Sequence, residues 1–177
     1  MNSTELSYKN SPSEMTEKDF VEVFGGVYEH SPWIARYAWH QGLSKEHNTS
    51  SALSEIMMEV VENAEHKKIL ALINAHPDLA GKAAIDGKLT EESTSEQSGA
   101  GIDQCTATEF EMFQRFNNDY KEKFNFPFIM AVKGSNRHQI FEAFEVRIKN
   151  DEETEFKQAV AEINKIARFR LDALAES

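Results

Sequence analysis

The chain has only one cysteine among its 177 residues, and long hydrophobic runs are missing. A single thiol, Cys105, excludes an intrachain disulfide framework and a zinc cluster built from several thiolates, as is usual in a reducing compartment. No stretch approaches the roughly 18 apolar residues of a membrane-spanning helix, and residues 1–5 do not resemble a secretion signal. The last three residues are not a peroxisomal signal of the Ser-Lys-Leu type. We therefore expect a soluble, cytoplasmic protein with no membrane partner.

Basic residues are also scarce, since 19 lysines and arginines stand against 30 aspartates and glutamates. The resulting formal charge of -11 repels nucleic acid and anionic lipid, so neither is an expected partner. The remaining composition, 40% hydrophobic and 28% charged, is typical of a globular protein. At this length we expect one folded domain, over residues 16–177, preceded by a flexible arm at residues 1–15.

Sequence motifs for metal, nucleotide and serine chemistry are missing as well. The six histidines form no HExxH pair, and there is no GxSxG, GxxxxGK or GxGxxG motif. Cys105 lies close to Asp103, whose charge would raise the pKa of the thiol and so disfavours a nucleophilic role. No metal and no cofactor is indicated, and acid/base chemistry is the class that remains.

What the chain does contain is helical periodicity. Hydroxyl residues followed by acidic residues indicate helix starts at Thr16 and Thr90, and apolar residues recur at three- and four-residue spacing. The expected helices cover about residues 17–24, 32–41, 50–64, 69–75, 90–99, 108–124, 137–150 and 152–174. The sequence thus predicts an all-α fold, a single-domain helical bundle of about seven to nine helices. We expect the aromatic stripe of the helix over 108–124 to be core.

One apolar run does not fit this helical pattern. Residues 126–132 have Pro127 near their start and are followed by Lys133-Gly134. Their composition is typical of a strand, although no second strand is visible. We expect a short, buried, extended segment. Its backbone groups need hydrogen-bond partners and could offer them to a ligand.

Two polar segments are the candidates for chemistry. Pro77 disfavours helical geometry at the preceding residue, which places His76 at a helix C-terminus. Farther along, Ser93, Glu96 and Gln97 can share one helical face. Both features have ordinary explanations too: a histidine there can interact with the helix dipole, and a polar helix can simply be solvated.

These segments also resemble a known family, that of OHCU decarboxylase, where OHCU is 2-oxo-4-hydroxy-4-carboxy-5-ureidoimidazoline. The order and spacing of the similar positions agree over about residues 16–174. The resemblance is carried by Phe24–Trp33, His76–Lys82, Leu89–Ser93, Glu96–Gln97, Ala100–Gly101, Asn117, Tyr120, Lys123–Phe124, Phe126–Ile129 and Ile163–Leu171. Each motif alone is weakly specific, but the set together is specific.

The resemblance implies an all-helical homodimer that converts OHCU to (S)-allantoin in urate degradation, with neither metal nor organic cofactor. It implies that His76 is the catalytic acid/base and that Glu96 also takes part. An arginine of the last helix should contribute, and of Arg168 and Arg170 we favour Arg170. The substrate-binding positions that it implies are Pro77, Ser93, Thr94, Ser95, Glu96, Gln97, Phe128, Ile129, Met130, Ala131 and Val132.

Side-chain chemistry is compatible with these roles. A histidine can accept or donate a proton near neutral pH, Glu96 can accept N–H groups, and Gln97 can donate to a carbonyl. Because the substrate is an anion and the protein carries -11, we expect Arg170, with Lys82, to provide local positive charge. The alternatives are a non-catalytic helical module that binds a ureido or purine-like ligand, and a purely structural helical dimer.

Overall fold

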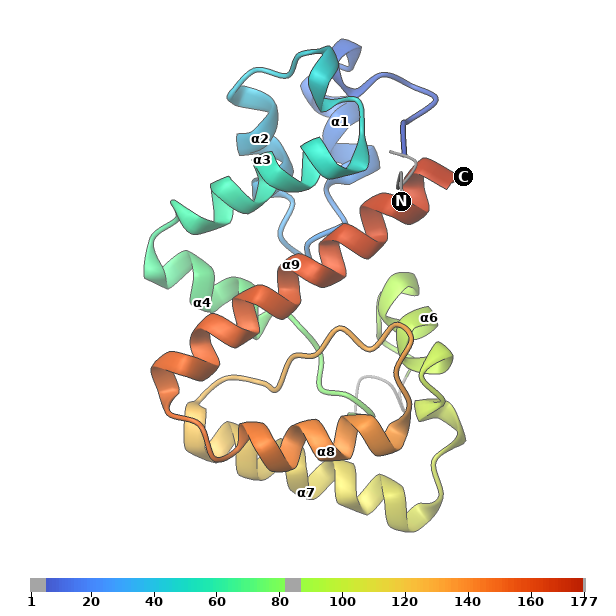
Figure 1. Ribbon diagram of the computed structural model, residues 1–177, viewed down its shortest axis with the longest axis vertical. Coiled ribbons are helices and arrows are strands. Elements are labelled where there is room, and N and C mark those ends of the chain that lie inside the picture. Colours follow the sequence, from blue (N-terminus) through green and yellow to red (C-terminus); the bar gives the residue numbers. More distant parts are fainter. Residues whose placement is uncertain (1–5, 82–86, 177) are drawn as a thin grey trace, which may run out of the picture. The chain divides into compact units, whose positions relative to one another are not determined.

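The computed structural model describes residues 6–81 and 87–176, and helices are the regular elements in these two ranges (Figure 1). They comprise eight α-helices and three short 3-10 helices, and the one backbone pairing of β type is an isolated bridge between Ser7 and Thr49. The prediction of an all-α fold is therefore confirmed.

The chain divides into two compact units. Unit 1 consists of Met1–Ala75 and Ile163–Ser177, and unit 2 of His76–Glu162. The boundary falls inside the last helix, α9, which runs from Glu152 to Glu176. The extent of the single domain predicted over residues 16–177 stays a prediction.

Unit 1 is built from four helices and the C-terminal part of α9. The helices are α1 (Glu17–Phe24), α2 (Trp33–His40), α3 (Ser50–Glu62) and α4 (His66–Asn74), with 3-10 turns η1 (Pro12–Glu14) and η2 (Lys45–His47). The Thr16 hydroxyl accepts a hydrogen bond from the backbone N–H of Asp19, so α1 begins at the predicted cap. Phe20, Leu53 and Leu171 are fully buried in the core of this unit.

The N-terminal segment is hydrogen-bonded to unit 1 from Leu6 onward. The Leu6 carbonyl accepts from the backbone N–H of Ser50, and the Tyr8 hydroxyl donates to the Leu171 carbonyl at 2.9 Å. Residues 1–5 of the predicted arm lie outside the described residues. The part of the arm that is described is thus attached to the helices around it.

Unit 2 contains α6 (Glu91–Gly99), η3 (Ile102–Gln104), α7 (Ala107–Phe124), α8 (Arg137–Arg147) and the first turns of α9. Figure 1 shows α7 and α8 side by side, and aromatic rings join them: the Phe113 and Phe141 ring centroids are 4.6 Å apart. Phe113, Tyr120 and Phe124 are buried, which confirms that most of the aromatic stripe is core.

The segment between α7 and α8 forms no regular element, and its apolar part is largely buried. Asn125 ends α7 with a positive φ of 62°, which turns the chain sharply. Phe126, Phe128, Ile129 and Val132 are buried, so the predicted buried segment is confirmed. Unlike a strand of a sheet, it is not hydrogen-bonded to a neighbouring strand, so its backbone N–H and C=O groups must find other partners.

Candidate functional site

His76 lies just beyond the end of α4. The helix ends at Asn74, Ala75 caps it, and Pro77 follows His76, so the helix stops where the proline predicts. The residue is only 8% exposed. A nearly buried histidine has little contact with solvent, so the protein around it sets its position.

The chain that follows His76 is held by side chains from α6 and α7. The backbone N–H of Ala80 donates to Oε1 of Gln97 at 3.0 Å, and Nδ2 of Asn117 donates to the Leu79 carbonyl at 2.8 Å. Nε2 of Gln114 donates to the Ala80 carbonyl, also at 2.8 Å. Side chains from two helices thus fix three backbone groups of this loop.

Two further features constrain the same loop. Ala80 has a positive φ of 52°, an unusual conformation for a residue with a Cβ atom. A Cβ atom on Gly81 would lie 2.7 Å from Cβ of Asp78, so no larger residue fits there without a shift. Nζ of Lys121 forms an ion pair of 2.6 Å with Oδ2 of Asp78, which attaches the start of the loop to α7.

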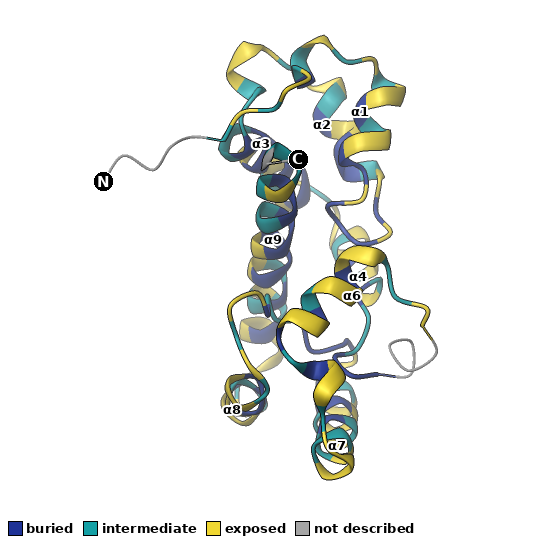
Figure 2. Cartoon of the chain, turned by 90° about the vertical axis from the view of Figure 1, so that its right-hand side faces the viewer, coloured by how far each residue is buried: buried dark blue, intermediate teal, exposed yellow. Residues whose placement is uncertain are grey.

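Helix α6 is exposed along most of its length, and a narrow face of it is buried (Figure 2). Ser93 and Gln97, one turn apart, are 4% and 6% exposed, and Glu96 is half-buried. Thr94 and Ser95 are exposed, and the Thr94 hydroxyl donates to the Thr90 carbonyl. Ser93 and Gln97 therefore lie on one face, as the helical spacing predicts, whereas substrate binding by Thr94 and Ser95 stays a prediction.

In the segment of residues 128–132, two half-buried residues lie between buried ones. Phe128, Ile129 and Val132 are buried, whereas Met130 and Ala131 are half-buried. The segment can therefore offer a ligand backbone groups near Met130 and Ala131 more readily than the side chains of its buried residues.

The predicted arginine, Arg170, belongs to unit 1 and is 6% exposed. Its Nη1 atom lies 2.8 Å from Oε2 of Glu29, which is also buried. Arg168 instead pairs with Asp172, the next residue along its own helix face, and its side chain is 43% exposed. Arg170 thus differs from Arg168 because it is buried and because its ion-pair partner is far away in the sequence.

Sequence reasoning missed several residues around these positions. The family resemblance includes Asn117 without a role for it, although a buried asparagine in an aromatic stripe is a signal for a structural hydrogen bond. Glu29, Lys121 and Gln114 gave no such signal, because charged and amide residues are usually exposed. Lys82, expected to add positive charge, lies outside the described residues.

A cavity of about 680 Å³ lies beside α6, η3 and the start of α7. Two predicted site residues, Thr94 and Gln97, belong to its described lining. Other described residues that line it include Ala80, Phe110 and Cys105. Burial is the main cause that raises the pKa of the Cys105 thiol, followed by the charge of Glu109, and Asp103 adds a smaller effect. The direction agrees with the prediction, and it disfavours a thiolate facing the cavity.

The described residues contain neither a metal-binding cluster nor a membrane-spanning helix. Within residues 6–81 and 87–176, no group of three histidine, cysteine or acidic side chains is placed to hold a metal ion. None of the helices in those ranges is long and apolar enough to cross a membrane.

Comparisons with known proteins give a consistent result. A family model described as OHCU decarboxylase matches residues 13–172. The chain is 39% identical to 2-oxo-4-hydroxy-4-carboxy-5-ureidoimidazoline decarboxylase of Haloferax volcanii, over 90% of each chain. It is 30% identical to the protein of that name from Xenopus laevis, over 92% of this chain and 91% of the other.

The fold is also similar to that of a solved structure, the crystal structure of (S)-allantoin synthase. The TM-score is 0.73 and the identity 27%, and the match covers 92% of this chain. The match covers about half of the length of that protein, 52%.

Proposed function

Because this chain belongs to the OHCU decarboxylase family, we propose that it removes CO2 from OHCU and forms (S)-allantoin in the breakdown of urate. The observation that carries the proposal is the buried His76, which precedes a loop fixed by Gln97 and Asn117. A general acid/base needs such a fixed position, because it must lie within hydrogen-bond distance of the atom that gives or takes the proton, whatever its pKa. No metal and no organic cofactor is part of the proposed reaction.

The chemistry of OHCU defines what the site must do. The bond between the carboxylate and the ring carbon breaks, CO2 leaves, and the electron pair is delocalised into the conjugated ring. The hydroxyl on the same carbon loses its proton and becomes a carbonyl, and the ring carbon that bears the ureido group gains a proton. The ring nitrogen that receives the electron pair takes up one more proton from the solvent. Delivery of that proton to one face sets the S configuration, so the enzyme needs a positioned acid/base and partners that hold the ring.

The residues of unit 2 divide these tasks in our proposal. His76 accepts the hydroxyl proton and donates one to the ring carbon. Glu96, half-buried on α6, accepts N–H groups of the ureido substituent or ring. Gln97 uses Oε1 for the loop, and its Nε2, at 3.5 Å from the Asp78 carbonyl, is the donor for a substrate carbonyl.

The other predicted contacts complete the proposal. The backbone of residues 128–132 forms hydrogen bonds with the substrate, and Arg170 interacts with its carboxylate or a carbonyl through the planar guanidinium fork. Pro77 and the stretch Ser93 to Ser95 contact the ring.

We also propose that the protein is a homodimer in the cytoplasm. Membership of the family supports the dimer, and the lone thiol of Cys105 agrees with a reducing compartment. Light scattering on the purified protein should give twice the chain mass of 20.1 kDa. A mass that stays at one chain over a wide concentration range would contradict the dimer, and fractionation of cells tests the location.

The decisive experiment follows the chirality of the allantoin. OHCU is generated in situ from urate, and circular dichroism of the product is recorded with wild type, His76→Ala and His138→Ala. His138 is an exposed histidine on α8 and serves as the matched control. We expect excess (S)-allantoin with wild type and His138→Ala, and racemic product at the spontaneous rate with His76→Ala. Racemic product with wild type would overturn the proposed function.

A further inference from the structure

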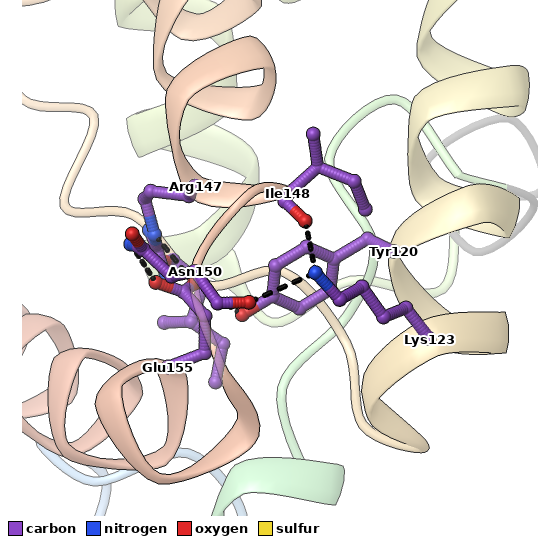
Figure 3. Close-up of polar contacts among 7 residues, drawn as sticks. Tyr120, Lys123, Arg147, Ile148, Asn150 and Glu155 are labelled. Carbon is purple, nitrogen blue, oxygen red and sulfur yellow. Dashed lines mark hydrogen bonds and ion pairs between the residues drawn. The ribbon is translucent and has the colours of Figure 1, made fainter.

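A buried polar network joins α7, α8 and the first turn of α9 within unit 2 (Figure 3). At its centre is Glu155, whose exposed fraction is 0%. Its Oε1 atom accepts hydrogen bonds from the Tyr120 hydroxyl at 2.6 Å and from Nε of Arg147 at 2.8 Å. Its Oε2 atom accepts one from Nδ2 of Asn150 at 2.9 Å. The carboxylate is thus surrounded by donors from three different parts of the chain.

Arg147 connects this carboxylate to the segment between α7 and α8. Its Nη1 atom donates to the carbonyl of Ile129 at 2.6 Å, and the guanidinium lies 4.3 Å from the ring centroid of Phe128. Arg147 is the last residue of α8 and is 7% exposed. One planar group therefore binds Glu155 on one edge and holds two consecutive residues of the segment.

Stability alone is a weak reason for such an arrangement. Desolvation of a buried arginine and glutamate offsets most of their attraction, and apolar residues of similar volume often stabilise a core as well or better. What the pair provides is geometry, because a planar fork bound at two positions has little freedom. The group that this pair holds in position is the Ile129 carbonyl.

Fixing that carbonyl fixes more than one atom. The peptide unit between Ile129 and Met130 is planar and trans, so the Met130 N–H points in the direction opposite to the Ile129 carbonyl. With the carbonyl held by Arg147, the N–H is directed away from Arg147. Met130 is also where the segment becomes half-buried instead of buried.

We propose that Arg147 is a positioning residue, which holds the Ile129 carbonyl so that the Met130 N–H is presented to the substrate. The inference rests on the proposed function, in which residues 128–132 bind OHCU, and it adds a residue that does not itself contact the substrate. Glu155 orients Arg147, and Tyr120 and Asn150 complete the shell of the carboxylate.

The test compares Arg147→Lys with Tyr120→Phe. Lysine keeps the charge beside Glu155 but has no fork to reach the Ile129 carbonyl at the same time. Tyr120→Phe removes the other donor to the same Oε1 atom and leaves the bond between Arg147 and Ile129. For Arg147→Lys we expect KM to rise about tenfold, with kcat within about threefold of wild type. For Tyr120→Phe we expect both constants to stay within about twofold of wild type.

A second readout does not depend on activity. Amide hydrogen exchange of the peptide that covers residues 126–132 should become faster in Arg147→Lys and stay unchanged in Tyr120→Phe. If Arg147→Lys unfolds, the double variant Arg147→Met with Glu155→Gln leaves no unpaired charge buried. It should fold and show the same rise in KM and in exchange.

The outcomes separate the two proposals. Equal effects of Arg147→Lys and Tyr120→Phe, or unchanged KM and exchange in Arg147→Lys, overturn the positioning role. Racemic allantoin from wild type overturns the proposed function instead, and the exchange comparison then still decides whether Arg147 holds the segment.

Discussion

The Nη1 atom of Arg170 lies 2.8 Å from Oε2 of Glu29, and both side chains are buried. The pair changes the electrostatic expectation for an anionic substrate, because the carboxylate of Glu29 offsets the charge of the guanidinium. Arg170 therefore offers directed N–H groups more than net positive charge. Its proposed role in binding depends on the geometry of the fork.

Arg170→Lys should lower kcat/KM about tenfold with little change in the free energy of unfolding. Lysine keeps a cation opposite Glu29, so no unpaired charge is buried, but it loses the planar fork. Arg168→Lys is the matched control, since Arg168 lies on the same helix and pairs with Asp172. Steady-state kinetics and urea unfolding of both variants check the prediction. Equal kcat/KM for Arg170→Lys and wild type would exclude a role for the fork.

Asn117→Ala should lower the free energy of unfolding by about 2 kcal/mol, because the Leu79 carbonyl loses its donor in a buried site. Activity should fall by more than the fraction of unfolded protein accounts for, because the loop after His76 loses one of the hydrogen bonds that hold it. Asn118→Ala, at the exposed neighbouring position on α7, should change neither quantity appreciably. Urea titrations and kinetics measure both effects. A similar small change in both variants would mean that Asn117 does not hold the loop.

Local sequence signals predicted the helices well. Thr16 and Thr90 each accept a hydrogen bond at the start of a helix, as their sequence context predicts. Periodicity alone located α7, whose cap, Thr106, the sequence analysis did not name. Pro77 likewise located the end of α4. These features depend on residues within one or two turns of each other, which is why they are readable from the sequence.

Partners on different elements were not readable. Glu29 and Arg147 are charged residues of a kind that usually lies on the surface, and only the folded chain shows that each is buried against a partner on α9. The hydrogen bond of Gln97 was not readable for the same reason. Helical spacing placed it on one face with Ser93 and Glu96, but its hydrogen bond to Ala80 depends on how the loop after His76 packs.

Gly81→Ala should lower activity strongly, because the new Cβ atom would lie 2.7 Å from Cβ of Asp78 and must displace the loop after His76. Gly99→Ala is the matched control, since it lies at the end of α6 and a Cβ atom there meets nothing within 4 Å. We expect Gly99→Ala to be as active as wild type and slightly more stable. Rates of (S)-allantoin formation compare the two. Full activity of Gly81→Ala would show that the loop tolerates the shift.

The acid stability of the protein should depend in part on Asp151, which precedes α9. Hydrogen bonds from the Thr154 hydroxyl and the Thr154 backbone N–H lower the pKa of Asp151 below its ordinary value of 3.8. A carboxyl whose pKa is lowered by folding stabilises the protein above the ordinary pKa, and this contribution is lost as the pH falls through the lowered value. Asp151→Asn keeps a side-chain acceptor without the charge. Its Tm should lie below that of wild type near neutral pH, and the difference should shrink as the pH falls below 3.8. Thermal unfolding followed by circular dichroism measures this, and a difference that is independent of pH would refute the assignment.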